Sequence, residues 1–288
     1  MEQSAVYEGY TNQATTADID LWREDGNYPW MVKISSLVCP SDPIKINTGE
    51  IGGSNYYANR GDLYVQFDFP GGNPPGSPQR DHRGRGPFTR FGENFSYTSD
   101  GLSNTLLLME VSNGSGGSNV PRQGFVLSGA SSQLTRNYNM NPNACYNLKQ
   151  GNVLNTDAAN LAGNSYAGGA GSEPNSLPGL RWHDGRSLFS QCFAILPPNS
   201  PRCATNGADY RTYNLVSAGS YHTGGCNVSL GDGSGKFVSE TVDWGTTGVS
   251  AKDAGLTNGA ESYRYKGKSI YGVWGSMGSA WGGESASL

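Results

Sequence analysis

Hydrophobic residues occur in short runs separated by turn-forming residues, a pattern typical of β-strands. The strongest run, residues 105–111, is bounded by turn formers on both sides and predicts a buried strand. Residues 227–240 form two short alternating runs joined by a turn that contains Asp232 and Gly233, a pair that tolerates positive φ angles. This second pattern predicts a β-hairpin. We therefore expect a mostly antiparallel β structure.

The first forty residues predict two further elements. Residues 1–10 have hydrophobic positions at 1, 6, 7 and 10 and no helix breaker before Gly9, which predicts a short helix. Residues 28–39 are hydrophobic enough to belong to the core, and the Pro-rich block 39–43 then predicts a rigid turn. A short helix added to a mostly antiparallel β structure gives the α+β class.

Two long segments, 70–92 and 150–178, are rich in Gly, Asn, Pro or Ala and show little periodicity. Segments of this kind usually run over the surface, so we predict two loop insertions. No repeat of fixed period and no clear linker divides the chain, so residues 1–288 are expected to form a single domain.

The composition agrees with a loop-rich β protein and excludes some functions. Gly (42) and Pro (15) make up about a fifth of the 288 residues, against roughly 12% in average proteins, which excludes long helices over most of the chain. The net charge is −4, and the 20 basic residues form no block, so we expect no nucleic-acid partner. No run of eighteen apolar residues occurs, so no membrane span is predicted in this chain.

The five cysteines are Cys39, Cys145, Cys192, Cys203 and Cys226, and none forms a C-x-x-C pair, which argues against a zinc knuckle or a thioredoxin-type motif. Cys192 and Cys203 flank a turn-rich stretch and could form a disulfide, which would constrain the unfolded chain by about 3 kcal/mol. The sequence leaves oxidised and reduced states open. Abundant Asn, Ser, Tyr and Gly suit a protein outside the cytosol.

Six short blocks follow one another along the whole chain. They are Met1-Glu2-Gln3 with Val6-Tyr7; Cys39-Pro40-Ser41-Asp42-Pro43; Asp100-Gly101-Leu102-Ser103-Asn104-Thr105 with Glu110; Trp182-His183-Asp184-Gly185-Arg186 followed by Leu196-Pro197-Pro198-Asn199; His222 with Asp232-Gly233 after nine residues; and Val273-Trp274-Gly275 with Gly282-Gly283-Glu284. In this order they resemble the prepilin-like proteins of domain-of-unknown-function family 1559, including that family's His-x9-Asp-Gly signature.

The resemblance implies a type IV pilin-like product, in which a prepilin leader and a long apolar helix precede an α+β head domain. We expect that leader and helix ahead of the Met1 block, and this sequence does not contain them. The implied function is that of an exported, non-enzymatic structural protein, a pseudopilin-like component of the cell surface, envelope or periplasm. Its implied partners are further copies of itself or other pilin-like envelope proteins.

The sequence offers few catalytic candidates. It has no G-x-S-x-G elbow, no phosphate-binding glycine loop and no H-E-x-x-H motif. His222 and Asp232 have two interpretations. They are metal ligands that the hairpin brings together, or, as we favour, His222 bonds backbone at the start of a strand while Asp232 caps its own turn. A metal-dependent hydrolase is the function that the first interpretation would imply.

Other polar and aromatic residues also leave alternatives open. Asp42 and Asp100 lie at tight turns, where a carboxylate caps backbone N–H groups, although such oxygen ligands also suit calcium. Glu110 is either a buried carboxylate paired with Arg181 or Arg186, or the first exposed position after its strand.

The aromatic residues either fill the core or stack against sugars. The second interpretation makes an extracellular solute- or glycan-binding module the alternative function. The tryptophans concerned are Trp30, Trp182, Trp244, Trp274 and Trp281.

Overall fold

The computed structural model describes residues 4–14, 28–44, 50–62, 85–88, 94–128, 142–155, 160–161, 176–205, 214–245 and 267–284. Most of the two expected loop insertions, 70–92 and 150–178, lies outside the described residues.

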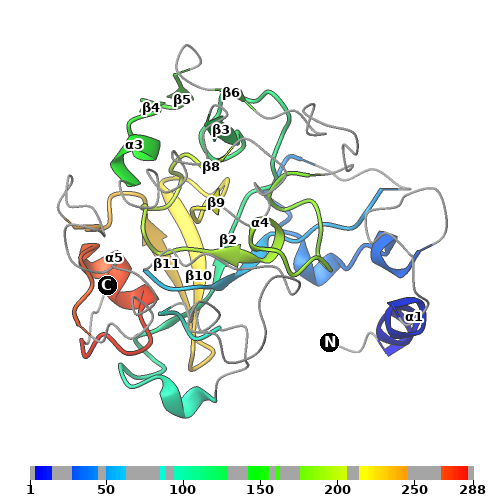
Figure 1. The fold of residues 1–288 in the computed structure, drawn as a ribbon, viewed down its shortest axis with the longest axis horizontal. Helices are drawn as coiled ribbons and strands as arrows, with labels where there is room; N and C mark the ends of the chain where they lie inside the picture. Colours follow the sequence, from blue (N-terminus) through cyan, green and yellow to red (C-terminus); the bar gives the residue numbers. More distant parts are fainter. Residues whose placement is uncertain are drawn as a thin grey trace.

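A five-stranded sheet in the order β11-β10-β2-β1-β7 organises the fold (Figure 1). Neighbouring strands are antiparallel except β1 and β7, which run parallel. The predicted buried strand is β2, and the predicted hairpin is the pair β10 and β11, so both predictions are confirmed. The strands are β1 (Tyr56–Asn59), β2 (Leu106–Glu110), β7 (Gln191–Cys192), β10 (Gly225–Leu230) and β11 (Gly235–Ser239).

Shorter strands form a second sheet and a small hairpin. The second sheet has the order β6-β3-β8-β9, and its pair β3 and β8 is parallel. Strands β4 and β5 pair with each other through a turn at Gly151, whose φ of 61° suits glycine. The strands are β3 (Val126–Ser128), β4 (Lys149–Gln150), β5 (Val153–Leu154), β6 (Asn160–Leu161), β8 (Cys203–Thr205) and β9 (Asn214–Leu215).

The helices are short and lie around the sheets, so the α+β class is confirmed. Helix α1 overlaps the helix predicted over residues 1–10 and continues past Gly9 to Ala14. Figure 1 shows it at the edge of the molecule, away from both sheets. Among the described residues, no helix combines the length and apolar character needed to cross a bilayer. The helices are α1 (Ser4–Ala14), α3 (Pro142–Tyr146), α4 (Ser187–Ser190) and α5 (Gly272–Gly278), with 3₁₀ turns η1 (Pro29–Met31), η2 (Ser35–Leu37) and η4 (Phe95–Tyr97).

The main core lies against one face of the central sheet. In β10, Cys226, Val228 and Leu230 are buried while the intervening residues are less so, which is the period-two pattern of a strand with one buried face. Trp274 of α5 is fully buried in this core, and its Nε1–H donates to the Leu196 carbonyl at 2.8 Å. The segment 28–39 only partly joins the core: Trp30, Ile34 and Cys39 are buried, but other residues of the segment are exposed.

The disulfide joins Cys145 to Cys203, so the expected Cys192–Cys203 pair is wrong. Cys192 lies in β7 of the central sheet and is a free, buried thiol, whereas Cys203 lies in β8 of the second sheet. Burial raises the pKa of the Cys192 thiol, which therefore stays protonated. Helix α3 brings Cys145 to Cys203 with their Cα atoms 6.1 Å apart. The cysteine nearest to Cys203 in the sequence, Cys192, is thus not its disulfide partner.

We predict that opening this disulfide lowers the free energy of unfolding by about 4 kcal/mol, because it closes a long loop whose ends are 58 residues apart. Urea unfolding of the wild type with and without a reducing agent measures the loss. The Cys145→Ala/Cys203→Ala double variant is the control, since the same reducing agent should leave its stability unchanged. Equal stability of oxidised and reduced wild type would contradict the prediction.

Candidate functional site

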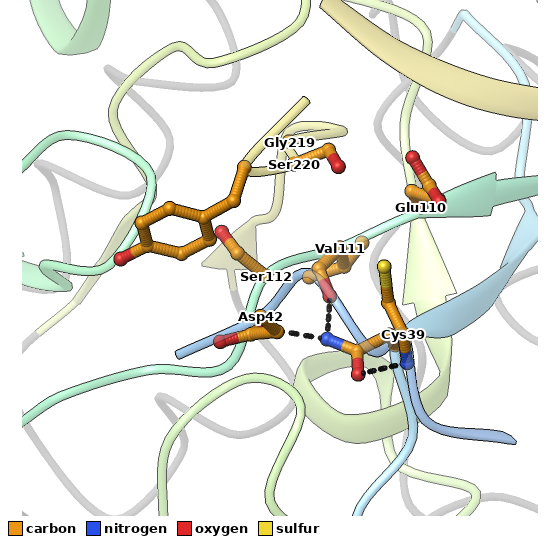
Figure 2. Close-up of a pocket in the computed structure, with 9 residues that line it drawn as sticks. Cys39, Asp42, Glu110, Val111, Ser112, Gly219 and Ser220 are labelled. Carbon is orange, nitrogen blue, oxygen red and sulfur yellow. Dashed lines mark hydrogen bonds between the residues drawn. The ribbon is translucent and has the colours of Figure 1, made fainter. Parts of the chain in front are cut away.

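The 39–43 block is tied to the end of strand β2 by a buried network of hydrogen bonds. Asp42 accepts the N–H of Ile44 at 2.9 Å through Oδ1 and the N–H of Asn113 at 2.7 Å through Oδ2. Asn55 donates its Nδ2–H to Asp42 at 2.8 Å and accepts the Cys39 N–H at 2.8 Å (Figure 2). The network fixes the backbone at Cys39. Pro40 is exposed in the turn.

Glu110, the last residue of β2, faces His222 and the neighbouring strand. Its Oε2 accepts the Asn227 N–H at 2.7 Å, and its Oε1 lies 3.4 Å from His222 Nε2. The side chain is 5% exposed. It is a buried, paired carboxylate, as one expectation had it, but its expected partner is wrong. Both arginines considered, Arg181 and Arg186, instead pair with Asp184, at 3.2 Å in the first case.

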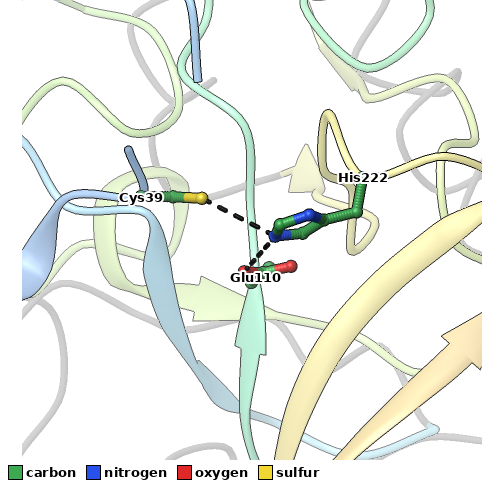
Figure 3. A group of neighbouring side chains, drawn as sticks. All are labelled: Cys39, Glu110 and His222. Carbon is green, nitrogen blue, oxygen red and sulfur yellow. Dashed lines mark hydrogen bonds and ion pairs between the residues drawn. The ribbon is translucent and has the colours of Figure 1, made fainter. Parts of the chain in front are cut away.

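Cys39, Glu110 and His222 form a compact group of three chemically reactive side chains (Figure 3). Cys39 Sγ lies 3.9 Å from His222 Nε2, the same nitrogen that faces Glu110. The thiol and the carboxylate therefore converge on one imidazole nitrogen. In a nucleophile–base–acid triad the two partners contact opposite ring nitrogens. The three side chains are thus arranged as ligands that surround one point, and not as a proton relay through the imidazole.

Two cavities adjoin this group. A small one of about 10 Å³ is lined by Cys39, Asp42, Glu110 and Tyr221 among others, and it offers room for about one water molecule or ion. A larger one of about 400 Å³ is lined by mixed charges and amides. His222 and Tyr221 belong to its wall, and Arg122 stacks 4.5 Å above the Tyr221 ring. Burial raises the pKa of Tyr221, so its hydroxyl stays protonated.

Asp232 lies at the far end of strand β10 from His222. It occupies the exposed hairpin turn, where its Oδ1 accepts the N–H of Ser234 at 2.9 Å, and Gly233 follows with a φ of 86°. Hydrogen bonds from Ser234 lower the pKa of Asp232. Six residues of strand span about 20 Å. The structure therefore does not bring His222 and Asp232 together. Asp232 makes the turn that we favoured from the sequence, but the favoured role of His222 is wrong, because its ring faces Glu110 and Cys39 instead of a backbone group.

Asp100 joins the third family block to the last one. Its Oδ2 accepts the Gly282 N–H at 2.7 Å and its Oδ1 accepts the Gly283 N–H at 2.9 Å. Gly101 takes a φ of 89°, and Asn104 donates its Nδ2–H back to the Asp100 carbonyl at 3.1 Å. The block is a turn that holds the C-terminal segment against the start of β2.

The fourth block also serves packing. Trp182 donates its Nε1–H to the Val32 carbonyl at 3.0 Å, and Gly185 is exposed beside Asp184 and its arginines. Pro197 is buried, and Asn199 has a φ of 62°, the left-handed region. Asn199 accepts the N–H of Ser220 at 3.0 Å and donates to Glu240 at 3.0 Å. These contacts hold the loop that carries His222.

The tryptophans considered as sugar platforms serve mostly as packing residues. Trp30 and Trp274 are fully buried, and Trp30 stacks on Tyr28 with ring centroids 4.6 Å apart. Trp244 packs against Tyr146 at 4.7 Å. These contacts agree with the core interpretation of the aromatic residues.

The family described as "Protein of unknown function (DUF1559)" matches this sequence over residues 1–245. The chain belongs to the DUF1559 family. Five of the six blocks lie inside the matched range, and the last block, from Val273 to Glu284, follows it. No curated protein and no solved structure matches this DUF1559 chain.

Sequence reasoning singled out Cys39, Glu110 and His222 separately, as parts of three blocks, and did not group them. It missed Asn55 and Asn113, which complete the network around Asp42. No local signal marks either asparagine, because both act through partners that are distant in sequence. The only common signal of the three grouped residues is that each belongs to a DUF1559 block.

We predict that Asp42→Ala lowers the free energy of unfolding by about 3 kcal/mol, because it removes the acceptor of the buried Asn113 N–H and one acceptor of the buried Asn55 amide, which keeps the Val111 carbonyl. Asp232→Ala is the matched control. It removes the same kind of turn cap from an exposed site, so its effect should be much smaller. Urea unfolding monitored by tryptophan fluorescence compares the two, and equal losses would contradict the prediction.

The Asp184 carboxylate gives a pH-dependent prediction. Burial raises the pKa of Asp184, but hydrogen bonds and positive charge from Arg186, with the charge of Arg181, outweigh it, so the pKa lies below 3.8. Asp184 therefore stabilises the fold fully above its unfolded pKa and loses this contribution as the pH falls through the lower, folded pKa. Between about pH 5 and pH 3, wild type should lose more stability than Asp184→Asn.

Urea unfolding across that pH range measures the difference. The control is Asp243→Asn, which removes an exposed carboxylate that bonds backbone N–H groups instead of an arginine. The same loss in Asp184→Asn as in wild type would count against the assigned role of Asp184.

Proposed function

We propose that this protein is an exported, non-enzymatic structural protein, a pseudopilin-like head domain that acts through protein–protein assembly at the cell surface or in the envelope. The observation that carries the proposal is the use of the family's polar residues. Asp42, Asp100 and Asn199 each bond backbone groups of a distant segment, so these three residues hold loops in place rather than present groups to a substrate. Such residues give a rigid scaffold with variable loops.

The disulfide supports export. Cys145 and Cys203 are both fully buried and bonded, and disulfides of this kind form and persist mainly in oxidising compartments outside the cytosol. The three remaining cysteines, Cys39, Cys192 and Cys226, are buried thiols, which are protected from pairing between molecules. Both features suit a protein that works outside the cytoplasm.

The position of α1 supports assembly through the N-terminal side of the head. The helix packs against η1 and stands apart from the sheets (Figure 1), and Tyr7 on it is 70% exposed. A helix attached at one edge can pair with neighbouring subunits without disturbing the sheets. This arrangement fits a display domain whose assembly surface and exposed loops are separate.

Cysteine cross-linking tests the proposal in the cells that produce the protein. We predict that Tyr7→Cys gives covalent oligomers with a bis-maleimide that does not cross the cytoplasmic membrane, because neighbouring helices bring the thiols together. Asp232→Cys, in the exposed hairpin turn, is the control and should react without forming oligomers. The wild type reports the background of the buried thiols.

Each outcome of this experiment decides part of the proposal. Covalent oligomers of Tyr7→Cys, without oligomers of Asp232→Cys, support the proposal. If neither variant reacts with the bis-maleimide, the protein is not exported. If Tyr7→Cys is labelled but stays monomeric, the protein does not assemble through α1.

A second candidate, an extracellular solute-binding module, is favoured by one observation. The larger cavity has a volume of about 400 Å³, within the usual range of small-molecule sites, and its wall combines Arg122, Lys149 and Glu240 with a tyrosine and amides. Such a wall suits a polar solute. Labelled but monomeric protein in the cross-linking experiment would favour this function over assembly.

A further inference from the structure

Three potential metal ligands converge beside the small cavity, on segments that the chain brings from far apart. Cys39 follows η2, Glu110 ends β2 and His222 precedes β10. One ligand atom from each, Sγ, a carboxylate oxygen and an imidazole nitrogen, lies within 4.8 Å of the other two. Figure 3 shows the sulfur and the carboxylate pointing at the same edge of the imidazole ring. We propose that Cys39, Glu110 and His222 bind a Zn²⁺ ion.

The two distances to His222 Nε2 are close to those of tetrahedral zinc. Bond lengths of about 2.0–2.2 Å to nitrogen and oxygen and about 2.3 Å to sulfur place tetrahedral ligands about 3.4 Å apart for an N/O pair and about 3.6 Å apart for an N/S pair. The observed separations are 3.4 Å for His222 Nε2 to Glu110 Oε1 and 3.9 Å for His222 Nε2 to Cys39 Sγ. The Cys39–His222 pair is therefore about 0.3 Å longer than tetrahedral zinc requires. Cys39 Sγ and the Glu110 oxygen, which lie within 4.8 Å of each other, must approach to about 3.6 Å, so binding requires a side-chain shift of up to about 1.2 Å.

The choice of ligands also selects the metal. A thiolate, an imidazole and a carboxylate together suit zinc, whereas calcium and magnesium take oxygen ligands. Forming the Zn–S bond releases the thiol proton of Cys39 to solvent, and the thiolate and the Glu110 carboxylate then balance the two charges of the ion. Calcium, which the sequence left open, has the wrong ligands here.

A hydrogen bond fixes the Glu110 carboxylate, as is usual for a ligating carboxylate, and two others fix the backbone at Cys39 and His222. The Cys39 N–H donates to Asn55 at 2.8 Å, and Glu110 accepts the Asn227 N–H through the oxygen that does not face His222. The backbone N–H of His222 donates to Ser220 Oγ at 3.2 Å. The Glu110 carboxylate and the backbone that carries the other two ligands are therefore positioned before an ion arrives.

The site is accessible to solvent from one side. Cys39 and Glu110 are buried, while the His222 side chain is 34% exposed and lines the larger cavity. Three protein ligands leave the fourth tetrahedral position for a water molecule. The ion would connect three segments of the head domain, so the proposal does not depend on whether the protein assembles or binds a solute.

Cobalt titration of metal-free protein tests the site, because a cysteine thiolate bound to Co²⁺ gives a charge-transfer band in the near ultraviolet. We predict that one equivalent of Co²⁺ produces this band in wild type and that one equivalent of Zn²⁺ removes it. Cys39→Ala should abolish the band. His222→Ala and Glu110→Gln should weaken cobalt binding at least tenfold. Zn²⁺ should also raise the Tm of wild type and leave that of Cys39→Ala unchanged.

The controls distinguish this site from other thiols and histidines of the chain. Cys226→Ala and His183→Gln change a buried free cysteine and a histidine outside the group, and both should keep the wild-type band. The absence of a band in folded wild type, its survival in Cys39→Ala, or a failure of Zn²⁺ to displace Co²⁺ would overturn the proposal. If Cys39→Ala does not fold, the wild-type titration and the His222→Ala variant, which changes a partly exposed side chain, still test the zinc site.

Discussion

The placement of strand β2 in the middle of the central sheet is the constraint on which the rest of the structure depends. It pairs with β1 on one side and β10 on the other, so its backbone groups are bonded along both edges. Its two ends are also fixed. The Asp100 turn holds the C-terminal segment at its start, and the Asp42 network holds the 39–43 turn just beyond its end. The segments that build the candidate site are thus positioned by one buried strand.

Buried arginines extend this pattern of internal connections. Arg85 pairs with Asp62 at 3.1 Å, and Arg202 donates to the Ser112 carbonyl at 2.7 Å, just after β2. Burial lowers the pKa of Arg202 to about 10, well above neutral pH, so the side chain remains charged. Burial raises the pKa of Asp62 despite the charge of Arg85. Because an unpaired buried charge is costly, these residues hold their neighbours in one arrangement.

The features that could be predicted from the sequence are those determined by neighbours in the chain. The hydrophobic run of β2, the alternating hairpin and the Asp232 turn, which closes over two residues, all follow local rules. The partners of Glu110 and of Cys203 could not be predicted. Each is decided by which strands pair in space, and the contact between Cys39 and His222 spans 183 residues.

The disulfide has a consequence for oxidative folding. In an unfolded chain, Cys203 meets Cys192, eleven residues away, more easily than Cys145, and loop closure favours that wrong pair by about 1.5 kcal/mol. The native pair forms because β7 docks beside β1 and withdraws Cys192 into the core. The chain must therefore complete its β1–β7 pairing before Cys203 is oxidised. Otherwise it depends on a thiol–disulfide isomerase to replace the Cys192–Cys203 disulfide by the native one.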